Sequence, residues 1–310
     1  KAEQKRFKNI SIDSRTTKKG DIFFAIKGQR YDGHDFIADA ITRGAKAVVI
    51  AKNITHVVKE NAQIAILKVN DTSVALGKLA AFYRLKHAIP FVAITGTNGK
   101  TTTKEIIATV LSKENRVLKN FGTFNNHIGV PLTIFQLQRS HEVGVVELGT
   151  NHFGEIAYLS RIVAPQVAVI TNIGFSHLEF LKDTKGVLKE KSSVIRDLKK
   201  PKILLLNRDD VFLGKMRLPK TVNVLYFGMK EKSDFMASQI SLHDNRIHFV
   251  LNKRHAFSLR TLGRFNIYNA LAGIGCGLVF GVSIKKIKSS LEDFEFLSHR
   301  LHKINCAHFS

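Results

Sequence analysis

The segment Gly96–Thr101 has the residue types and spacing of a phosphate-binding loop. Its members are Gly96, Thr97, Asn98, Gly99, Lys100 and Thr101, and Thr102 follows directly. Backbone N–H groups in the glycine turn and at the start of a following helix would point at phosphate oxygens. Lys100 would bring positive charge to the outer phosphates, and the Thr101 hydroxyl is suited to ligate Mg²⁺. The sequence therefore predicts a site for nucleotide phosphates and Mg²⁺ here.

A strand before this loop and a helix after it would hold the loop in place. The apolar run Phe91–Thr95 predicts the strand, and the pattern of Thr101–Glu114 predicts the helix. Further strands are expected at Val143–Leu148, Val167–Asn172 and Ile203–Asn207, with helical patterns between them. This alternation predicts a mostly parallel sheet covered on both faces.

Residues 222–262 differ, because short alternating runs with turn residues predict an antiparallel patch in the same unit. Helices are expected to resume at Asn266. The apolar stretch Ala270–Val282 is too short to cross a bilayer and is interpreted as a buried helix.

A smaller α/β unit is expected before Phe91. Its predicted strands are Ile22–Ile26, Ala47–Ala51 and Ile64–Val69, and its predicted helices are Phe36–Gly44 and Leu76–Lys86. We therefore expect two α/β domains, residues 1–86 and residues 87–310.

The composition narrows the classes of partner. The chain of 310 residues has 48 Lys and Arg against 25 acids, a formal net charge of +23. The basic residues are spread out, without the basic and aromatic runs typical of nucleic-acid binding, so we expect no nucleic-acid partner. Phosphate-bearing ligands would gain from the positive field. Two cysteines without a CxxC pair, Cys276 and Cys306, indicate a reducing, cytoplasmic location.

The loop in its full context, TGTNGKTTTKE, resembles the ATP loop of the Mur ligases, the amide-forming enzymes of peptidoglycan precursor synthesis. Further segments resemble, in the same order, the branch that adds D-alanyl-D-alanine to UDP-N-acetylmuramoyl-tripeptide. These segments are Ser11–Gly33 with His34-Asp35-Phe36, Asn125–Thr133, Glu147–Glu155 and Thr171–Glu179.

The resemblance implies an ATP-dependent ligase in which ATP converts a peptide carboxylate to an acyl phosphate, which the amine of D-alanyl-D-alanine attacks. It also implies that residues 1–86 bind the UDP substrate and residues 87–310 form the central ATP-binding domain. A third, C-terminal domain of the family is expected to be absent from this chain, so that residues 1–310 would bind ligands without ligating them. We expect a monomer without membrane insertion.

The resemblance also assigns metal and catalytic residues. Glu147 and His177 match Mg²⁺-side residues, with Thr101 as a further ligand. Lys191 matches a lysine that is carbamylated by CO₂ and then helps to hold a second Mg²⁺, with Lys189 as the alternative candidate. The catalytic residues implied are Lys100, His177 and Lys191.

The remaining assignments concern ATP and the peptide substrate. Those for the nucleotide are Asn266, Asn269 and Arg300, beside the loop residues. Those for the substrate are Ser14, Arg15, Gly33, His34, Asn125 and Asn126. The chain departs from the family pattern at His127, Ser192-Ser193 and Phe265. Two alternatives therefore stay open: a Mur-type ligase for another amino acid, and a degenerate nucleotide-binding paralogue without catalysis. The third residue of the peptide, diaminopimelate or lysine, is also left open.

Overall fold

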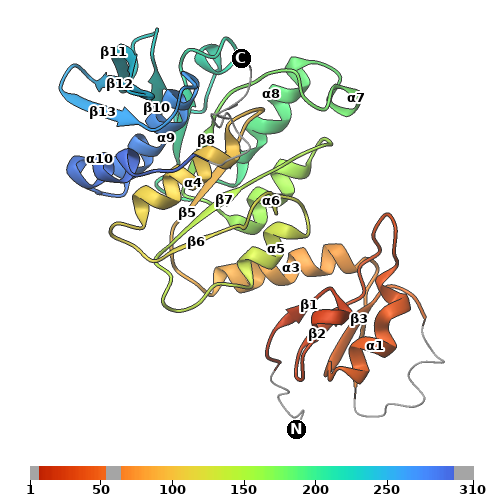
Figure 1. Cartoon of the computed structure of the whole chain (residues 1–310). Coiled ribbons are helices and arrows are strands. Elements are labelled where there is room, and N and C mark those ends of the chain that lie inside the picture. Colours follow the sequence, from red (N-terminus) through yellow and green to blue (C-terminus); the bar gives the residue numbers. More distant parts are fainter. Residues whose placement is uncertain (1–6, 54–63, 297–310) are drawn as a thin grey trace, which may run out of the picture. The chain divides into compact units, whose positions relative to one another are not determined.

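The computed structural model describes residues 7–53 and 64–296 (Figure 1). The described residues form two compact units that divide after His87, and the short segment Ile134–Gln136 groups with the first. Each unit has its own sheet and its own buried apolar cluster. The α/β fold predicted from alternating strands and helices is confirmed.

The first unit is built on a four-stranded sheet in the order β1-β2-β3-β4, and all of its pairings are parallel. The strands are β1 (Ile10–Ser11), β2 (Ile22–Phe24), β3 (Ala47–Ile50) and β4 (Ala65–Lys68). The helices are α1 (Ile37–Thr42) and α3 (Thr72–Leu85), and short 3-10 helices span Ser14–Thr16 and Gly33–Phe36. The buried cluster includes Phe23, Ile37 and Val48.

Two helices of this unit differ in extent from the prediction. The expected helix Phe36–Gly44 is shorter, because Gly33–Phe36 forms a 3-10 turn and α1 begins at Ile37. Helix α3 begins four residues before the expected Leu76. The reason is the N-cap at Asp71, whose side chain accepts from the Val74 N–H at 2.9 Å.

The second unit is built on a nine-stranded sheet in the order β13-β12-β11-β10-β9-β8-β5-β7-β6. The strands are β5 (Phe91–Thr95), β6 (Val117–Lys119), β7 (Val143–Glu147), β8 (Val167–Ile170), β9 (Ile203–Asn207), β10 (Asn223–Gly228), β11 (Phe235–His243), β12 (Arg246–Leu251) and β13 (His255–Leu259). The helices are α4 (Lys100–Leu111), α5 (Gly129–Ile134), α6 (Glu155–Val163), α7 (Leu178–Leu181), α8 (Thr184–Ser192), α9 (Asn266–Val279) and α10 (Ile284–Glu292). Short 3-10 helices span Ser193–Asp197 and Leu213–Lys215.

The strand order reverses around β5, which lies between β7 and β8 (Figure 1). Because crossovers between parallel strands are right-handed, the reversal puts α4 and α6 on opposite faces of the sheet. Side chains of α4, α9 and α10 join those of the central strands in one buried cluster. Strands β5, β7 and β8 are buried along their whole length, as expected for a sheet covered on both faces. In open sheets of this kind ligands bind at the carboxyl ends of the strands where the order reverses.

The predicted antiparallel patch is smaller than residues 222–262. Strand β10 pairs in parallel with β9 and β11, and only the pairs β11-β12 and β12-β13 are antiparallel. Strand β10 is exposed or partly buried at Asn223–Tyr226 and fully buried only at Phe227 and Gly228, so its sequence lacks the continuous apolar run of the central parallel strands. Helix α9 begins at Asn266 as expected but ends at Val279, before Gly281 with φ +77°.

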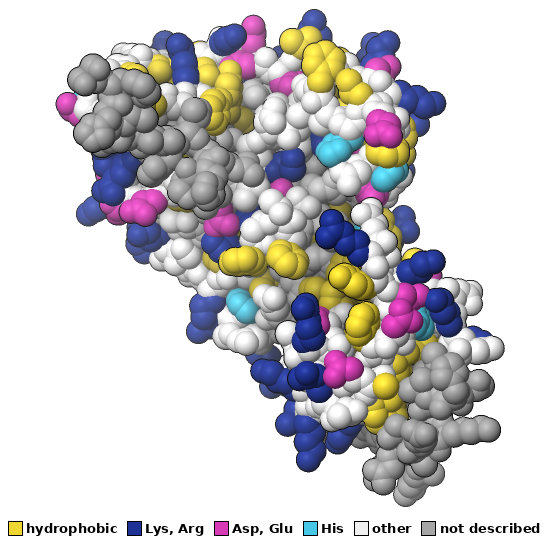
Figure 2. Space-filling model, turned by 45° about the vertical axis from the view of Figure 1, so that its right-hand side comes forward, with side chains coloured by type: hydrophobic (Ala, Val, Ile, Leu, Met, Phe, Trp, Pro, Cys, Tyr) yellow, Lys and Arg dark blue, Asp and Glu magenta, His cyan; other side chains and the backbone are white. Residues whose placement is uncertain are grey.

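In the described ranges, no helix is both long and apolar enough to span a membrane. Lysine and arginine side chains are dispersed over the face shown in Figure 2, with acidic side chains among them.

Candidate functional site

The phosphate-binding loop connects β5 to α4 through two glycines with positive φ, Gly96 at +143° and Gly99 at +80°. A Cβ added at Gly96 would lie 2.0 Å from Thr171 Oγ1, and one added at Gly99 would lie 2.5 Å from Asn269 Oδ1. Glycine is therefore required twice over, by backbone conformation and by close approach. Gly99 caps α4 without a side-chain hydrogen bond, so no capping side chain covers the first N–H groups of the helix. This is the geometry of an anion cradle.

The segment after β8 braces this loop. The Asn98 N–H donates to Asn172 Oδ1 at 2.9 Å, and Thr171 Oγ1 donates to the Asn98 carbonyl at 2.6 Å. The Gly174 N–H donates to Thr97 Oγ1 at 2.9 Å. These bonds fix the loop to the segment that follows the neighbouring strand.

Glu147 ends β7 and is 1% exposed. Its Oε1 accepts from Asn125 Nδ2 at 2.7 Å, whereas its buried Oε2 has no hydrogen-bond partner among the described residues. A buried carboxylate oxygen without a partner is costly, and a divalent cation would satisfy it. The residue therefore fits the Mg²⁺ role expected of it.

The other ligands of such a cation would be neutral oxygens or phosphate oxygens and not further carboxylates. Within the described ranges no three His, Cys, Asp or Glu side chains group closely enough to hold a metal. Mg²⁺ typically keeps one or two carboxylates and completes its shell with phosphate, hydroxyl and water oxygens. Thr101, the second residue of α4, is 5% exposed, and its hydroxyl is the candidate for such an oxygen ligand.

His177 follows β8 and takes a left-handed conformation, φ +51°, at the N-cap of α7. A positive φ at a non-glycine residue costs energy and is often found at functional sites. Burial lowers the pKa of the imidazole, and the nearby charges of Lys191 and Lys100 lower it further. The ring is therefore neutral near pH 7 and available as an acceptor or ligand.

Lys191 lies in α8 and is 2% exposed. Burial and the charge of Lys100 lower its pKa to about 7. The preceding residue, Glu190, accepts from the N–H groups of Gly154 and Ile156 at 2.7 Å each, which fixes α8 to the start of α6. The alternative candidate, Lys189, is exposed and lies over the ring of Phe153. The geometry therefore favours Lys191 over Lys189.

A cavity of about 590 Å³ adjoins the phosphate loop. It is lined by Asn98, Gly99, Thr102, Thr171, Asn172, Asn207, Phe227, Phe265, Tyr268 and Asn269. Phe265 is 50% exposed and offers an aromatic face to a planar ring. Tyr268 donates its hydroxyl to Asp209 Oδ2 at 2.8 Å, which fixes the second aromatic side chain. The position and lining suit a nucleotide base beside its phosphates.

Of the two asparagines expected at the base, only Asn269 lines this cavity. Its Oδ1 accepts from Thr103 Oγ1 at 3.1 Å, and its Nδ2 donates to Asn266 Oδ1 at 2.9 Å. Asn266 is 2% exposed and is bonded to Thr261, so it holds Asn269 in place. Arg300 lies outside the described residues.

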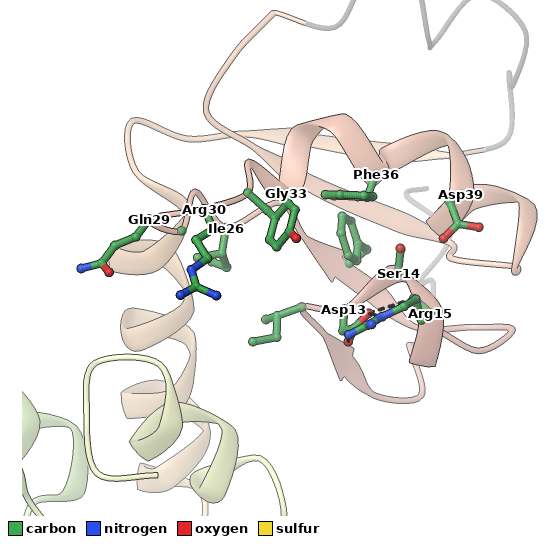
Figure 3. Close-up of a pocket in the computed structure, with 13 residues that line it drawn as sticks. Asp13, Ser14, Arg15, Ile26, Gln29, Arg30, Gly33, Phe36 and Asp39 are labelled. Carbon is green, nitrogen blue, oxygen red and sulfur yellow. Dashed lines mark hydrogen bonds and ion pairs between the residues drawn. The ribbon is translucent and has the colours of Figure 1, made fainter. Parts of the chain in front are cut away.

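The first unit has its own cavity, of about 950 Å³ (Figure 3). Ser14, Arg15 and Gly33 line it together with aromatic and aliphatic side chains. The guanidinium of Arg15 is held by Asp13, with Nε to Oδ1 at 3.0 Å and Nη2 to Oδ2 at 2.7 Å. A Cβ on Gly33 would lie 2.6 Å from the Ile26 backbone nitrogen, so only glycine fits this wall.

Two of the expected substrate contacts are engaged within the fold. The His34 ring pairs through Nδ1 with Asp32 at 2.6 Å and accepts the Ala51 N–H on Nε2 at 2.9 Å. Asn126 Oδ1 accepts from the Gly129 N–H at 2.8 Å and so caps the start of α5. The side chains of His34 and Asn126 therefore stabilise the loops in which Gly33 and Asn125 lie.

Sequence reasoning missed Glu190 and Tyr268. Tyr268 could have been found, because it is one turn from Phe265 in a segment already singled out. Glu190 gave no local signal, since its partners are more than 30 positions away.

Comparison with known proteins shows the family to which the chain belongs. The Mur ligase middle domain matches residues 94–277, and the Mur ligase family catalytic domain matches residues 6–84. The first match alone covers more than half of the chain, and it includes the phosphate loop, Glu147, His177 and Lys191. The chain belongs to the Mur ligase family.

The relatives narrow the class further. The chain is 36% identical over 301 residues to UDP-N-acetylmuramoyl-tripeptide–D-alanyl-D-alanine ligase of Buchnera aphidicola subsp. Acyrthosiphon pisum, covering 95% of this chain and 65% of the relative. It superposes on MurF from Acinetobacter baumannii with a TM-score of 0.91 at 35% identity, covering 99% and 67%. The MurF ligase from Thermotoga maritima in complex with ADP gives 0.86 at 28% identity, covering 95% and 68%. The chain thus spans about 65% of the length of the curated relatives that it matches.

Proposed function

We propose that the protein is an ATP-dependent amide ligase that adds D-alanyl-D-alanine to UDP-N-acetylmuramoyl-tripeptide in peptidoglycan precursor synthesis. One observation carries the proposal. The phosphate loop follows β5 at the carboxyl end of the strand. On the two neighbouring strands, Glu147 ends β7, and the segment that fixes the loop, Thr171–Gly174, follows β8. The names of the relatives support this choice of substrates, and the ADP complex of the Thermotoga maritima protein supports ATP.

The residues of the site suit phosphoryl transfer followed by amide formation. The N–H groups at the start of α4 and Lys100 would hold the phosphates of ATP while a carboxylate oxygen of the tripeptide attacks the γ-phosphorus and ADP leaves. The amine of D-alanyl-D-alanine would then attack the acyl carbon, the C–O bond to phosphate would break, and the amine would lose a proton. Mg²⁺, held by Thr101 and Glu147, would neutralise charge on the phosphates when bound.

We also propose that Lys191 is carbamylated. Only a neutral amine adds CO₂, and burial with a nearby positive charge at Lys100 favours the neutral amine. The reaction forms an N–C bond to CO₂ and releases a proton, so a buried cation becomes an anion. No carboxylate of the described residues forms an ion pair with Lys191, and carbamylation would replace a buried cation with an anion that attracts Lys100 or a metal.

The cavity of the first unit is proposed to take the UDP moiety, with Ser14, Arg15 and Gly33 in its wall. A guanidinium held in place suits a diphosphate. A cytoplasmic location accords with ATP and a UDP-linked peptide as substrates.

The proposal is tested by incubating the complete protein with ATP, a panel of UDP-muramoyl peptides and a panel of amino acids and dipeptides. Mass spectrometry should find amide product only for the tripeptide with D-alanyl-D-alanine, with one ADP formed per amide. Preference for another amine would move the protein to a different ligase branch, and ADP release without any amide would contradict the ligase assignment.

A further inference from the structure

Lys104 is a fully buried lysine that no part of the proposed reaction uses. It lies one turn into α4, four residues after Lys100, and its side chain is 0% exposed. Burying an ammonium group is costly unless its donors are all satisfied. The cost indicates that this charge is retained for a purpose other than filling the core.

The ammonium group is satisfied by two carbonyls and one carboxylate. Lys104 Nζ donates to the carbonyls of Asn120 and Gly122 at 2.8 and 2.9 Å and pairs with Glu105 Oε1 at 2.9 Å. Burial opposes ionisation of Glu105, but hydrogen bonds from Lys119 and Lys104 outweigh it and lower its pKa. The helix that begins with the phosphate loop is thus fastened to the segment after β6.

The fastened segment reaches Glu147 through the side chain of Asn120. Asn120 Oδ1 accepts the Glu147 N–H at 3.0 Å, and Nδ2 donates to the Glu147 carbonyl at 3.2 Å. Nδ2 also donates to the Phe124 carbonyl at 3.0 Å, which is next to Asn125, the residue that holds Glu147 Oε1. Asn120 is itself 0% exposed. The backbone and the carboxylate of Glu147 are therefore both positioned by one short segment.

We infer that Lys104 is a positioning residue that sets Glu147 for the cation and couples its place to the phosphate loop. This inference rests on the proposed function, in which Glu147 Oε2 meets Mg²⁺ beside the phosphates on α4. Residues that orient a metal ligand typically change metal affinity roughly 10- to 100-fold when they are removed. Lys104 and Lys100 lie on the same helix. The positions of the phosphates and of the Glu147 carboxylate therefore both depend on α4.

The inference is tested by Mn²⁺ binding, followed by electron paramagnetic resonance, in the presence of a non-hydrolysable ATP analogue. Lys104→Met should weaken Mn²⁺ binding by roughly 10-fold. Its affinity for the analogue without metal should remain near that of the wild type. Lys119→Met is the matched control, because Lys119 contacts the same Glu105 but is 44% exposed at its side chain. It should leave Mn²⁺ affinity unchanged.

A folded Lys104→Met protein with wild-type Mn²⁺ affinity would overturn the inference, as would an equal loss in the Lys119→Met control. If circular dichroism shows that Lys104→Met is unfolded, Asn120→Ser tests the same contacts between Lys104 and Glu147. This variant should also lose roughly 10-fold in Mn²⁺ affinity. Wild-type Mn²⁺ affinity in folded Asn120→Ser would overturn the inference. Analogue binding by the wild type in the presence of Mg²⁺ tests the proposed function separately. Absence of that binding would overturn the proposed function, and the inference with it.

Discussion

Asn125 holds one oxygen of Glu147, at 2.7 Å from Nδ2 to Oε1, and leaves the other oxygen buried without a hydrogen-bond partner among the described residues. The amide fixes the carboxylate in one orientation, so the unpartnered oxygen has a defined direction. A buried oxygen without a partner costs free energy, and a bound cation would remove that cost.

Glu147→Gln should lower the affinity for Mn²⁺ measured with a bound ATP analogue by roughly 10-fold or more, because a neutral amide oxygen replaces an anionic ligand. Glu142→Gln is the control. Glu142 precedes the same strand at its other end and is 48% exposed at its side chain. Equal Mn²⁺ affinity in Glu147→Gln and wild type would show that the cation does not bind at this carboxylate.

In the ligation assay with the complete protein, Lys191→Ala should remove most ligation, and added acetate or formate should restore part of it. A small free carboxylate would occupy the place of the carbamate in the buried space left by the side chain. Lys189→Ala should retain activity, since Lys189 is exposed. Rescue of Lys189→Ala instead of Lys191→Ala would transfer the role to Lys189.

The lowered pKa of Lys191 predicts a pH dependence of stability. Between its folded value of about 7 and the ordinary 10.5, the unfolded chain binds more protons at this site than the folded one. Stability should therefore rise with pH across this range, by at most about 1.4 kcal/mol per pH unit. Below the folded pKa the penalty is present in full.

Urea unfolding in CO₂-free buffers at about pH 7.5 and about pH 9 measures this effect in the wild type and in Lys191→Met. The wild type should gain stability relative to the variant by about 1 to 2 kcal/mol between the two conditions. Parallel pH profiles of the two proteins would mean that Lys191 titrates normally in the folded state.

Gly99→Ala should cost more stability than Gly281→Ala and should also weaken ATP binding. The two glycines have nearly the same φ, +80° and +77°, so the backbone cost of about 1 kcal/mol is shared. Only at Gly99 would the added Cβ meet another group, Asn269 Oδ1 at 2.5 Å, whereas nothing lies within 4 Å at Gly281. Thermal unfolding and calorimetry of both variants check the difference, and equal losses would remove any special role for the Gly99–Asn269 contact.

The parts of the site that are contiguous in sequence could be predicted. The loop Gly96–Thr101 lies between β5 and α4 as the strand and helix patterns indicated, and Glu147 ends its strand. These features depend on the local hydrophobic periodicity and on glycines that a turn with positive φ requires. The same holds for the parallel core of the larger sheet.

The parts that depend on distant partners could not be predicted. Lys104 lies in a polar stretch at the start of a helix and gives the pattern of an exposed residue, yet its partners are 16 and 18 positions away. The hydrogen bond from the Ala51 N–H to His34 Nε2 likewise joins residues 17 positions apart and has no local signal, and the substrate contact of His34 stays a prediction. Asn126 is different, because its hydrogen bond with Gly129 is local. The sequence could therefore have predicted that Asn126 caps a helix.

The central claim is that ATP binds on the loop Gly96–Thr101, and calorimetric titration of this chain with ATP and Mg²⁺ tests it most directly. The wild type should bind with one site. Lys100→Ala should lose binding, because Lys100 supplies the positive charge of the loop to the outer phosphates. Lys113→Ala, an exposed lysine just beyond the other end of α4, should bind like the wild type. An unchanged ATP affinity in Lys100→Ala would contradict the account.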